Sequence, residues 1–195
     1  MVAVETMNVG ATMRDVLARQ KAAQLREGAP TAEQRIRRIE RCISLLVDHR
    51  KAIEDALDAD FGARSRDATA LTDIAGGIGP LRYAKENLRR WMRTERRRTT
   101  PALLGLFGAK AEVRYQPKGV VGIISPWNFP VQLTFGPLAG VLAAGNRAMI
   151  KPSEHTPATS ELMARLFGEA FPEEEIAVLT GGPDVGAAFA GLPFD

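Results

Sequence analysis

The chain has 195 residues, 45% of them hydrophobic and 25% charged, which is typical of a folded globular protein rather than a disordered or fibrous one. Its only cysteine, Cys42, excludes an intramolecular disulfide and a thiolate metal cluster, and no apolar run approaches the ~18 uncharged residues of a membrane span. The net charge of +3 is mildly basic, and the opening residues lack the pattern of a signal peptide, so we expect a cytoplasmic protein.

Amphipathic helices are predicted for the first part of the chain. A short helix over 15–26 is ended by the Gly-Ala-Pro sequence at 28–30. Thr31 and Gln34 then have the spacing of a capping box. Isoleucines and leucines recur three or four residues apart through 36–61, which predicts two successive helical pieces that end near Phe61 and Gly62. Cys42 borders this apolar stripe, and we expect it to pack rather than to react.

A third helical region begins at Ser65 and is predicted to continue to about Arg98. Gly76, Gly77, Gly79 and Pro80 interrupt the pattern, so a kink or a brief break is expected there. The positions expected to be buried in this region are Leu71, Ile74, Ile78, Leu81, Leu88 and Trp91.

The arginine-rich segment at 89–98 has two interpretations. A basic stretch with an aromatic residue is one way to contact nucleic acid phosphates. The simpler interpretation is a solvated helix end, where arginines are favoured by the helix dipole and Trp91 belongs to the apolar stripe. We expect the helix end, and no nucleic acid partner.

Strands and helices alternate in the second part of the chain. Strands are predicted at AEVRYQP, GVVGIIS, RAMI and IAVLT, with helices over 130–144, from Pro157 after a Thr156 cap, and over 183–190. The alternation predicts an α/β protein in which an N-terminal helical region (1–110) and a connecting strand (111–118) precede a parallel, doubly wound, Rossmann-like sheet (119–195). Because LPFD leads toward a further strand, we expect the sheet to be incomplete and the chain to be the N-terminal part of a longer protein.

Three loops follow the predicted parallel strands. Ligands of such sheets bind beyond the carboxyl ends of the strands, so SPWNFP, KPSEHTP and TGGPDVG are the candidate site. The glycine fingerprint of the common dinucleotide-binding folds does not follow the first strand. No cluster of metal-ligating residues occurs either, and His155 stands alone, so no metal site is predicted.

Each loop leaves two interpretations open. Asn128, between Pro126 and Pro130, is either a donor to a developing negative charge or a turn residue that caps the next helix. Lys151 and Glu154 either bind ribose hydroxyls or form a surface ion pair. The glycines from Gly181 to Gly186 either admit a bulky ligand or only permit a tight turn.

Taken together, these motifs closely resemble the aldehyde dehydrogenase superfamily. The resemblance is most specific at GVVGIISPWNFP, PLAGVLAAGN, IKPSEHTP and TGGP. It extends more loosely through RYQP, the arginine-rich segment and ADFG (59–62), which are similar to the dimeric class-three branch, and to coniferyl aldehyde dehydrogenases within it. The family oxidises an aldehyde to a carboxylic acid with NAD or NADP, through a thioester on a cysteine.

The resemblance implies a role for several residues. Asn128 would help to form the oxyanion hole, and Trp127 would lie beside the passage for cofactor and substrate. Lys151 and Glu154 would bind the adenosine ribose and favour NAD over NADP, and Gly182 and Gly186 would lie near the adenine. Further cofactor contacts are implied at Ser125, Pro126 and Ser153.

The resemblance also implies that this chain lacks part of the machinery. Neither the catalytic cysteine nor the glutamate that activates water matches a residue of the chain, so we expect the 195 residues to be inactive alone. The partners implied are a small aldehyde and, in the longer parent, a second copy in a homodimer, and the strand over 111–118 resembles a piece of the oligomerisation sheet of the family. The alternative is a non-enzymatic module, derived from the same family, that binds a nucleotide or a protein partner.

Overall fold

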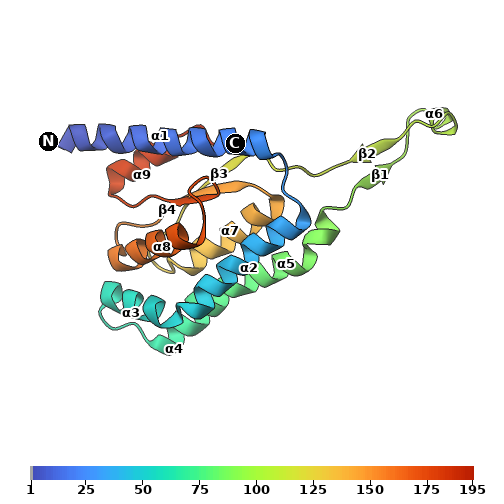
Figure 1. The fold of residues 1–195 in the computed structure, drawn as a ribbon. Helices are drawn as coiled ribbons and strands as arrows, with labels where there is room; N and C mark the ends of the chain where they lie inside the picture. The colour runs from blue at the N-terminus through green and yellow to red at the C-terminus, as the bar shows by residue number, and fades with distance from the viewer. Residues whose placement is uncertain (1) are drawn as a thin grey trace.

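The computed structural model describes residues 2–195, with side chains described at 10 and over 12–195. A parallel sheet lies at its centre in the order β3 (Val120–Ile124), β4 (Arg147–Lys151) and β5 (Ile176–Val178). Helices α1 (Val2–Glu27) and α9 (Pro183–Ala190) cover one face, and α7 (Gln132–Ala144) and α8 (Pro157–Ala170) cover the other (Figure 1). The predicted α/β class, a helical N-terminal region with a Rossmann-like parallel sheet, is confirmed.

Alternate residues of the strands point into two separate cores. Val120, Met149 and Ala177 pack against α1 and α9, whereas Ile123, Ile150 and Ile176 pack against the helices of the opposite face. Successive side chains of a strand point to opposite faces, so both faces of the sheet must be apolar to be covered. This explains why the strands read as apolar runs rather than as alternating patterns.

A second layer of helices covers α7 and α8. Helices α2 (Ala32–Asp48) and α5 (Gly76–Trp91) pack against α7, and α3 (Arg50–Phe61) packs against α8. The capping box at the start of α2 is confirmed, since Gln34 N donates to Thr31 Oγ1 and Thr31 N donates to Gln34 Oε1. Cys42 is fully buried in this core, as expected, and burial raises the pKa of its thiol.

Two helices differ from the prediction. Helix α1 begins at Val2 rather than at residue 15. In the third helical region, α4 (Arg66–Thr69) leads into a π-helical segment, η1 (Ala70–Ala75), so the irregularity lies before the glycines rather than at them. A wider turn shifts the following side chains around the axis, and Leu71 is 72% exposed although it was expected to be buried.

Only the first part of the arginine-rich segment is the expected helix end, since Arg89 and Arg90 lie in the last turn of α5. Helix α5 stops at Trp91, which is 39% exposed, and β1 (Glu95–Arg97) then pairs antiparallel with β2 (Ala111–Val113). The short helix α6 (Leu103–Leu106) lies at the tip of this hairpin, which projects away from the rest of the molecule (Figure 1). We call residues 95–113 the arm. Arg97 pairs with Glu95, two residues before it on the same side of the strand, so part of the positive charge of the arm is neutralised.

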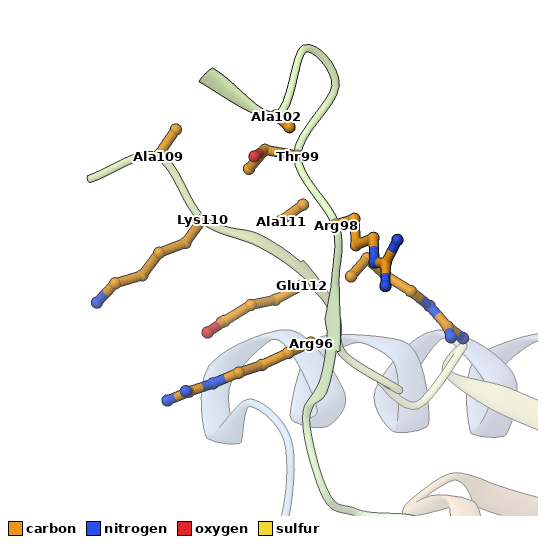
Figure 2. Close-up of a pocket in the computed structure, with 9 residues that line it drawn as sticks. Arg96, Arg98, Thr99, Ala102, Ala109, Lys110, Ala111 and Glu112 are labelled. Atoms are coloured by element: carbon orange, nitrogen blue, oxygen red, sulfur yellow. The ribbon is translucent and has the colours of Figure 1, made fainter. Parts of the chain in front are cut away.

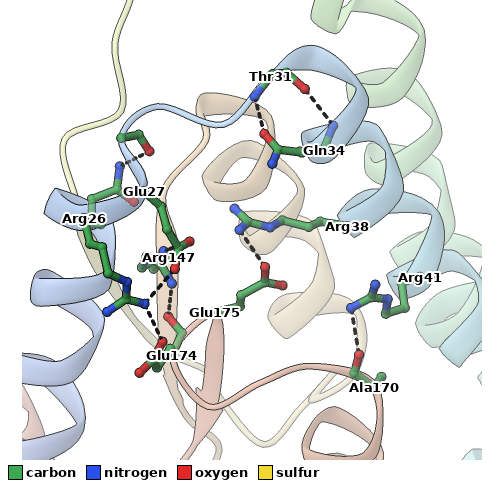
Figure 3. Close-up of polar contacts among 12 residues, drawn as sticks. Arg26, Glu27, Thr31, Gln34, Arg38, Arg41, Arg147, Ala170, Glu174 and Glu175 are labelled. Atoms are coloured by element: carbon green, nitrogen blue, oxygen red, sulfur yellow. Dashed lines mark hydrogen bonds and ion pairs between the residues drawn. The ribbon is translucent and has the colours of Figure 1, made fainter.

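Polar contacts fasten the N-terminal helices to the edge of the sheet (Figure 3). The buried Arg147 at the start of β4 bonds to the Glu27 carboxylate and to Glu174 O, and Arg38 of α2 bonds to Glu175. Burial raises the pKa of the Glu27 carboxyl, but the hydrogen bond and charge of Arg147 outweigh that effect and hold the pKa below its ordinary value.

Among the helices described, none is both long and apolar enough to cross a membrane.

Candidate functional site

The three predicted loops lie together at the carboxyl edge of the sheet. Strand β3 is in register with β4 so that Ile124 is opposite Lys151, and Ser125 N donates to Lys151 O at 3.1 Å. Beyond β5, Leu179 N donates to Ile150 O at 2.8 Å. All three strands run in the same direction, so their following loops meet at one edge, as the sequence predicted.

The loop after β3 presents its aromatic and amide side chains outward. Trp127 is 53% exposed, and Asn128 is also exposed. Ser125 is buried instead, and its Oγ accepts a hydrogen bond from Thr134 Oγ1 at 2.8 Å. Asn128 borders a hollow of about 560 Å³. The residues that line the hollow are Phe61, Ala63, Arg64, Ala68, Thr72, Asn128 and Phe129.

Two charged residues that the sequence analysis missed hold this loop from the helical region. Arg64 Nη1 donates to the backbone oxygen of Asn128 at 3.1 Å, and Arg64 Nη2 donates to Asp73 Oδ2 at 2.5 Å. Asp73, which is fully buried, also accepts from Val131 N at 3.2 Å and from Gln132 N at 3.4 Å. The only sequence signal was an aspartate among apolar residues of a predicted helix.

The loop after β4 contains an ion pair with one buried partner. Lys151 is 2% exposed, and its Nζ donates to Pro152 O at 2.8 Å and to Glu154 Oε2 at 3.0 Å. A hydrogen bond from its own backbone N–H, and then the one from Lys151, hold the pKa of the Glu154 carboxyl below its ordinary value. Ser153 is buried, and its Oγ accepts from His155 N. The burial of the lysine distinguishes this pair from an ordinary surface ion pair.

Helix α8 is capped by a residue that comes from another helix. Asp60, near the end of α3, accepts hydrogen bonds from Ala158 N at 2.9 Å and from Thr159 N at 2.8 Å. Thr156 occupies the N-cap position that the sequence predicted, but its side chain accepts no capping hydrogen bond, and its buried Oγ1 has no partner. The prediction of the capping side chain was therefore wrong, because the carboxylate of Asp60 already occupies the helix N-terminus.

The loop after β5 needs a glycine at one position. Gly181 has φ +148°, and a Cβ there would lie 2.5 Å from Val185 Cγ2. Gly182 is the N-cap of α9 with an ordinary φ of −75°, and a Cβ on Gly186 would meet no atom within 4 Å. Conformation therefore demands glycine at Gly181, whereas Gly186 leaves an open surface on α9.

A separate cavity of about 530 Å³ lies in the arm, away from these loops (Figure 2). Arg96, Lys110 and Glu112 extend to one side of the hairpin and Arg98 to the other (Figure 2). Over the described residues, no group of three or more histidine, cysteine, aspartate or glutamate side chains is placed to hold a metal ion.

Comparison with known proteins shows the family of this chain. The sequence model of the aldehyde dehydrogenase family matches residues 6–193. The chain belongs to the aldehyde dehydrogenase family. This aldehyde dehydrogenase chain is 66% identical over 185 residues to a probable coniferyl aldehyde dehydrogenase of Caulobacter vibrioides, a match that covers 95% of this chain and 38% of the relative. It is 49% identical over 180 residues to a coniferyl aldehyde dehydrogenase of a Pseudomonas species, covering 92% of this chain and 36% of that protein.

Solved structures show the same fold. The substrate-bound AldH of Staphylococcus aureus matches 94% of this chain and 39% of its own, with a TM-score of 0.85 and 30% sequence identity. A Mycobacterium tuberculosis aldehyde dehydrogenase in complex with NAD+ matches 91% of this chain and 36% of its own, with a TM-score of 0.76 and 27% identity. The aldehyde dehydrogenase chain described here thus spans less than half the length of the relatives that it matches.

Proposed function

We propose that this chain is the N-terminal part of an NAD-dependent aldehyde dehydrogenase that oxidises an aldehyde to a carboxylic acid. The observation that carries the proposal is the position of Asn128, which is exposed on a tightly held loop at the carboxyl edge of the sheet. Its side-chain NH₂ would donate to the oxygen of the aldehyde as negative charge develops there. The alternative of a capping asparagine loses support, because no side chain of this loop caps α7.

The proposed substrate is an aromatic aldehyde. The hollow beside Asn128 has two phenylalanine rings, Phe61 and Phe129, in its lining, and Trp127 packs against Phe61 with ring centroids 6.5 Å apart. Aromatic surfaces of this kind suit a planar ring. The names of the Caulobacter and Pseudomonas relatives point to coniferyl aldehyde, which carries such a ring, and we propose this class of substrate for the enzyme that contains this chain.

The residues of the loops that follow β4 and β5 suit the binding of NAD. Lys151 fixes one oxygen of the Glu154 carboxylate, and the side chain remains 31% exposed. A lysine donor beside a carboxylate acceptor suits the two hydroxyls of a ribose, and the negative charge disfavours the extra phosphate of NADP. The open surface at Gly186 leaves room for the adenine, and Gly182, where a Cβ would lie 3.0 Å from Asp184 Oδ1, is proposed to lie beside it. When bound, NAD would accept the hydride; the residues of this chain would hold and orient it.

The buried oxygens of Ser125 and Ser153 already serve the loops themselves. The contribution of these two residues, and of Pro126, to the cofactor site is therefore proposed to be the shape of the backbone rather than a direct hydrogen bond.

We further propose that activity requires residues beyond this chain. Its only thiol, that of Cys42, is fully buried in the core and has a raised pKa, so it is unsuited to attack an aldehyde.

We also propose a cytoplasmic location and a homodimer of the longer enzyme. The exposed Leu106 and Phe107 at the tip of the arm, 82% and 81% accessible, support a contact with a second copy.

The test is a fusion of this chain to the remaining C-terminal part of the Caulobacter relative. We expect NADH formation from coniferyl aldehyde by the fusion and none by the 195 residues alone. Asn128→Ala should lower kcat by about 10²–10³-fold, the usual loss for one oxyanion donor. Asn87→Ala is the matched control, since that asparagine lies on α5 and bonds to Tyr83 O.

Four results would contradict parts of the proposal. Unchanged kcat in Asn128→Ala would show that the asparagine is only a turn residue. If Glu154→Ala does not shift the preference of the enzyme toward NADP, Glu154 does not bind the ribose as proposed. Micromolar NAD binding by the isolated chain, with no turnover by the fusion, would favour the non-enzymatic binding module. Sedimentation of the fusion as a monomer would remove the homodimer.

A further inference from the structure

The backbone around Asn128 is held from both sides by one charged pair. Arg64 contacts the carbonyl oxygen of Asn128 at 3.1 Å, and Asp73 accepts the N–H groups of Val131 and Gln132, just after Pro130. The pair itself is joined at 2.5 Å. Because one contact lies before Pro130 and two lie after it, the pair fixes both ends of the tight turn that carries the amide.

The pair is shielded from water. The side chain of Asp73 is fully buried and that of Arg64 is 12% exposed. The guanidinium lies over two aromatic rings, 4.6 Å from the ring centre of Phe61 and 5.3 Å from that of Phe129. Rotamers that are locked by packing and by charge-assisted hydrogen bonds position a neighbouring group more accurately than an exposed pair does.

The two members of the pair do different work. Asp73 lies in the π-helical segment η1 and accepts the N–H groups of Val131, the N-cap of α7, and of Gln132, its first residue; Val131 itself offers no side-chain acceptor. A carboxylate at this end of a helix is stabilising, so loss of Asp73 would also loosen α7. Arg64 is the member that reaches Asn128 itself.

The direction of the Asn128 amide depends on its backbone. Within the part of the chain that the structure describes, no group hydrogen-bonds to this side chain, although Asn128 borders the hollow together with Arg64. Without a hydrogen bond of its own, a side chain is oriented mainly by the position of the backbone to which it is attached. A shift of the turn would therefore move the donor directly.

We propose that Arg64, itself held by Asp73, is a positioning residue that presents the Asn128 amide to the aldehyde oxygen. This inference rests on the proposed function of Asn128. It adds that the oxyanion donor is aligned from the helical region, through an ion pair whose carboxylate is fully buried.

A double-mutant cycle in the fusion enzyme tests the coupling. Arg64→Met should lower kcat by about 10–10²-fold, as a misplacement of ~1 Å can, with the KM for NAD unchanged. In the Asn128→Ala background the same substitution should lower kcat by less than about threefold, because the donor that it positions is already gone. Arg66→Met is the matched control, since Arg66 is exposed and pairs with Asp55.

A second variant, Arg64→Lys, separates positioning from folding. A lysine keeps a positive charge beside Asp73 but lacks the fork that reaches two partners. In the 195-residue chain carrying Trp91→Phe, we expect Arg64→Lys to keep the unfolding midpoint and to increase acrylamide quenching of Trp127, whereas Arg66→Lys changes neither. Unchanged quenching of Trp127 would overturn the inference even if Arg64→Met failed to fold.

The outcomes of the cycle are distinct. Equal losses from Arg64→Met with and without Asn128 would show a merely structural role, and no loss in either background would also overturn the inference; both leave the proposed function intact. If Asn128→Ala alone leaves kcat unchanged, the proposed function of Asn128 is wrong, and the inference fails with it.

Discussion

Replacement of Asp60 by alanine should destabilise the chain through a helix to which Asp60 does not belong. The carboxylate of Asp60 accepts the N–H groups of Ala158 and Thr159 at 2.9 and 2.8 Å, and so caps α8. Loss of a capping side chain costs typically ~1 kcal/mol, and loss of a negative charge at a helix N-terminus ~0.3–1 kcal/mol more. Asp60→Ala should therefore lower the free energy of unfolding by about 1–2 kcal/mol, or the melting temperature by ~2–8 °C at this chain length.

Urea unfolding of the 195-residue chain, followed by circular dichroism, measures the effect. Asp58→Ala is the matched control, because Asp58 is exposed on the same helix and the change in helix propensity is the same. Thr156→Val tests the competing cap and should cost less than ~0.5 kcal/mol, since its hydroxyl has no partner. Equal midpoints for Asp60→Ala and Asp58→Ala, together with a loss above ~1 kcal/mol in Thr156→Val, would refute the assignment of the cap.

Three further predictions concern other parts of the chain. Gly181→Ala should destabilise by ~1–3 kcal/mol, because its φ of +148° is strained for alanine, whereas Gly186→Ala should be neutral or stabilising in the same urea titration. Cys42 should react with a thiol reagent only as fast as the protein opens, and a rate like that of a free thiol would contradict its burial. The pKa of the Glu27 carboxyl is lowered by Arg147, so the ionised carboxylate stabilises the folded protein at pH values above the ordinary pKa of a glutamate. This stabilisation is lost as pH falls through the pKa of Glu27 in the folded protein. In Glu27→Gln, stability should therefore decline less steeply with acid.

The sheet and its loops were predictable because their signals are local. Apolar runs bounded by glycine and proline define β3 and β4, and parallel order follows from the intervening helices. The candidate residues after each strand therefore lie at one edge without any knowledge of side-chain contacts.

The supports of the site were not predictable, because they depend on contacts between distant residues. Asp60 caps a helix 98 residues away, and Arg64 reaches Asn128 across 64 residues. Neither residue belongs to a periodic pattern. The arm was missed for a related reason: Glu95–Arg97 has no apolar alternation, and only pairing with β2 makes it a strand.

The packing of α1 has a consequence for the synthesis of the protein. Met13, Val16 and Leu17 are covered by strands and by α9, and Lys21 bonds to Asp195, 174 residues later. At a ribosomal rate of ~5–20 residues per second, Asp195 would be synthesised about 9–35 s after Lys21. During this interval the nascent chain exposes an apolar helix face, on which chaperone binding would compete with premature aggregation.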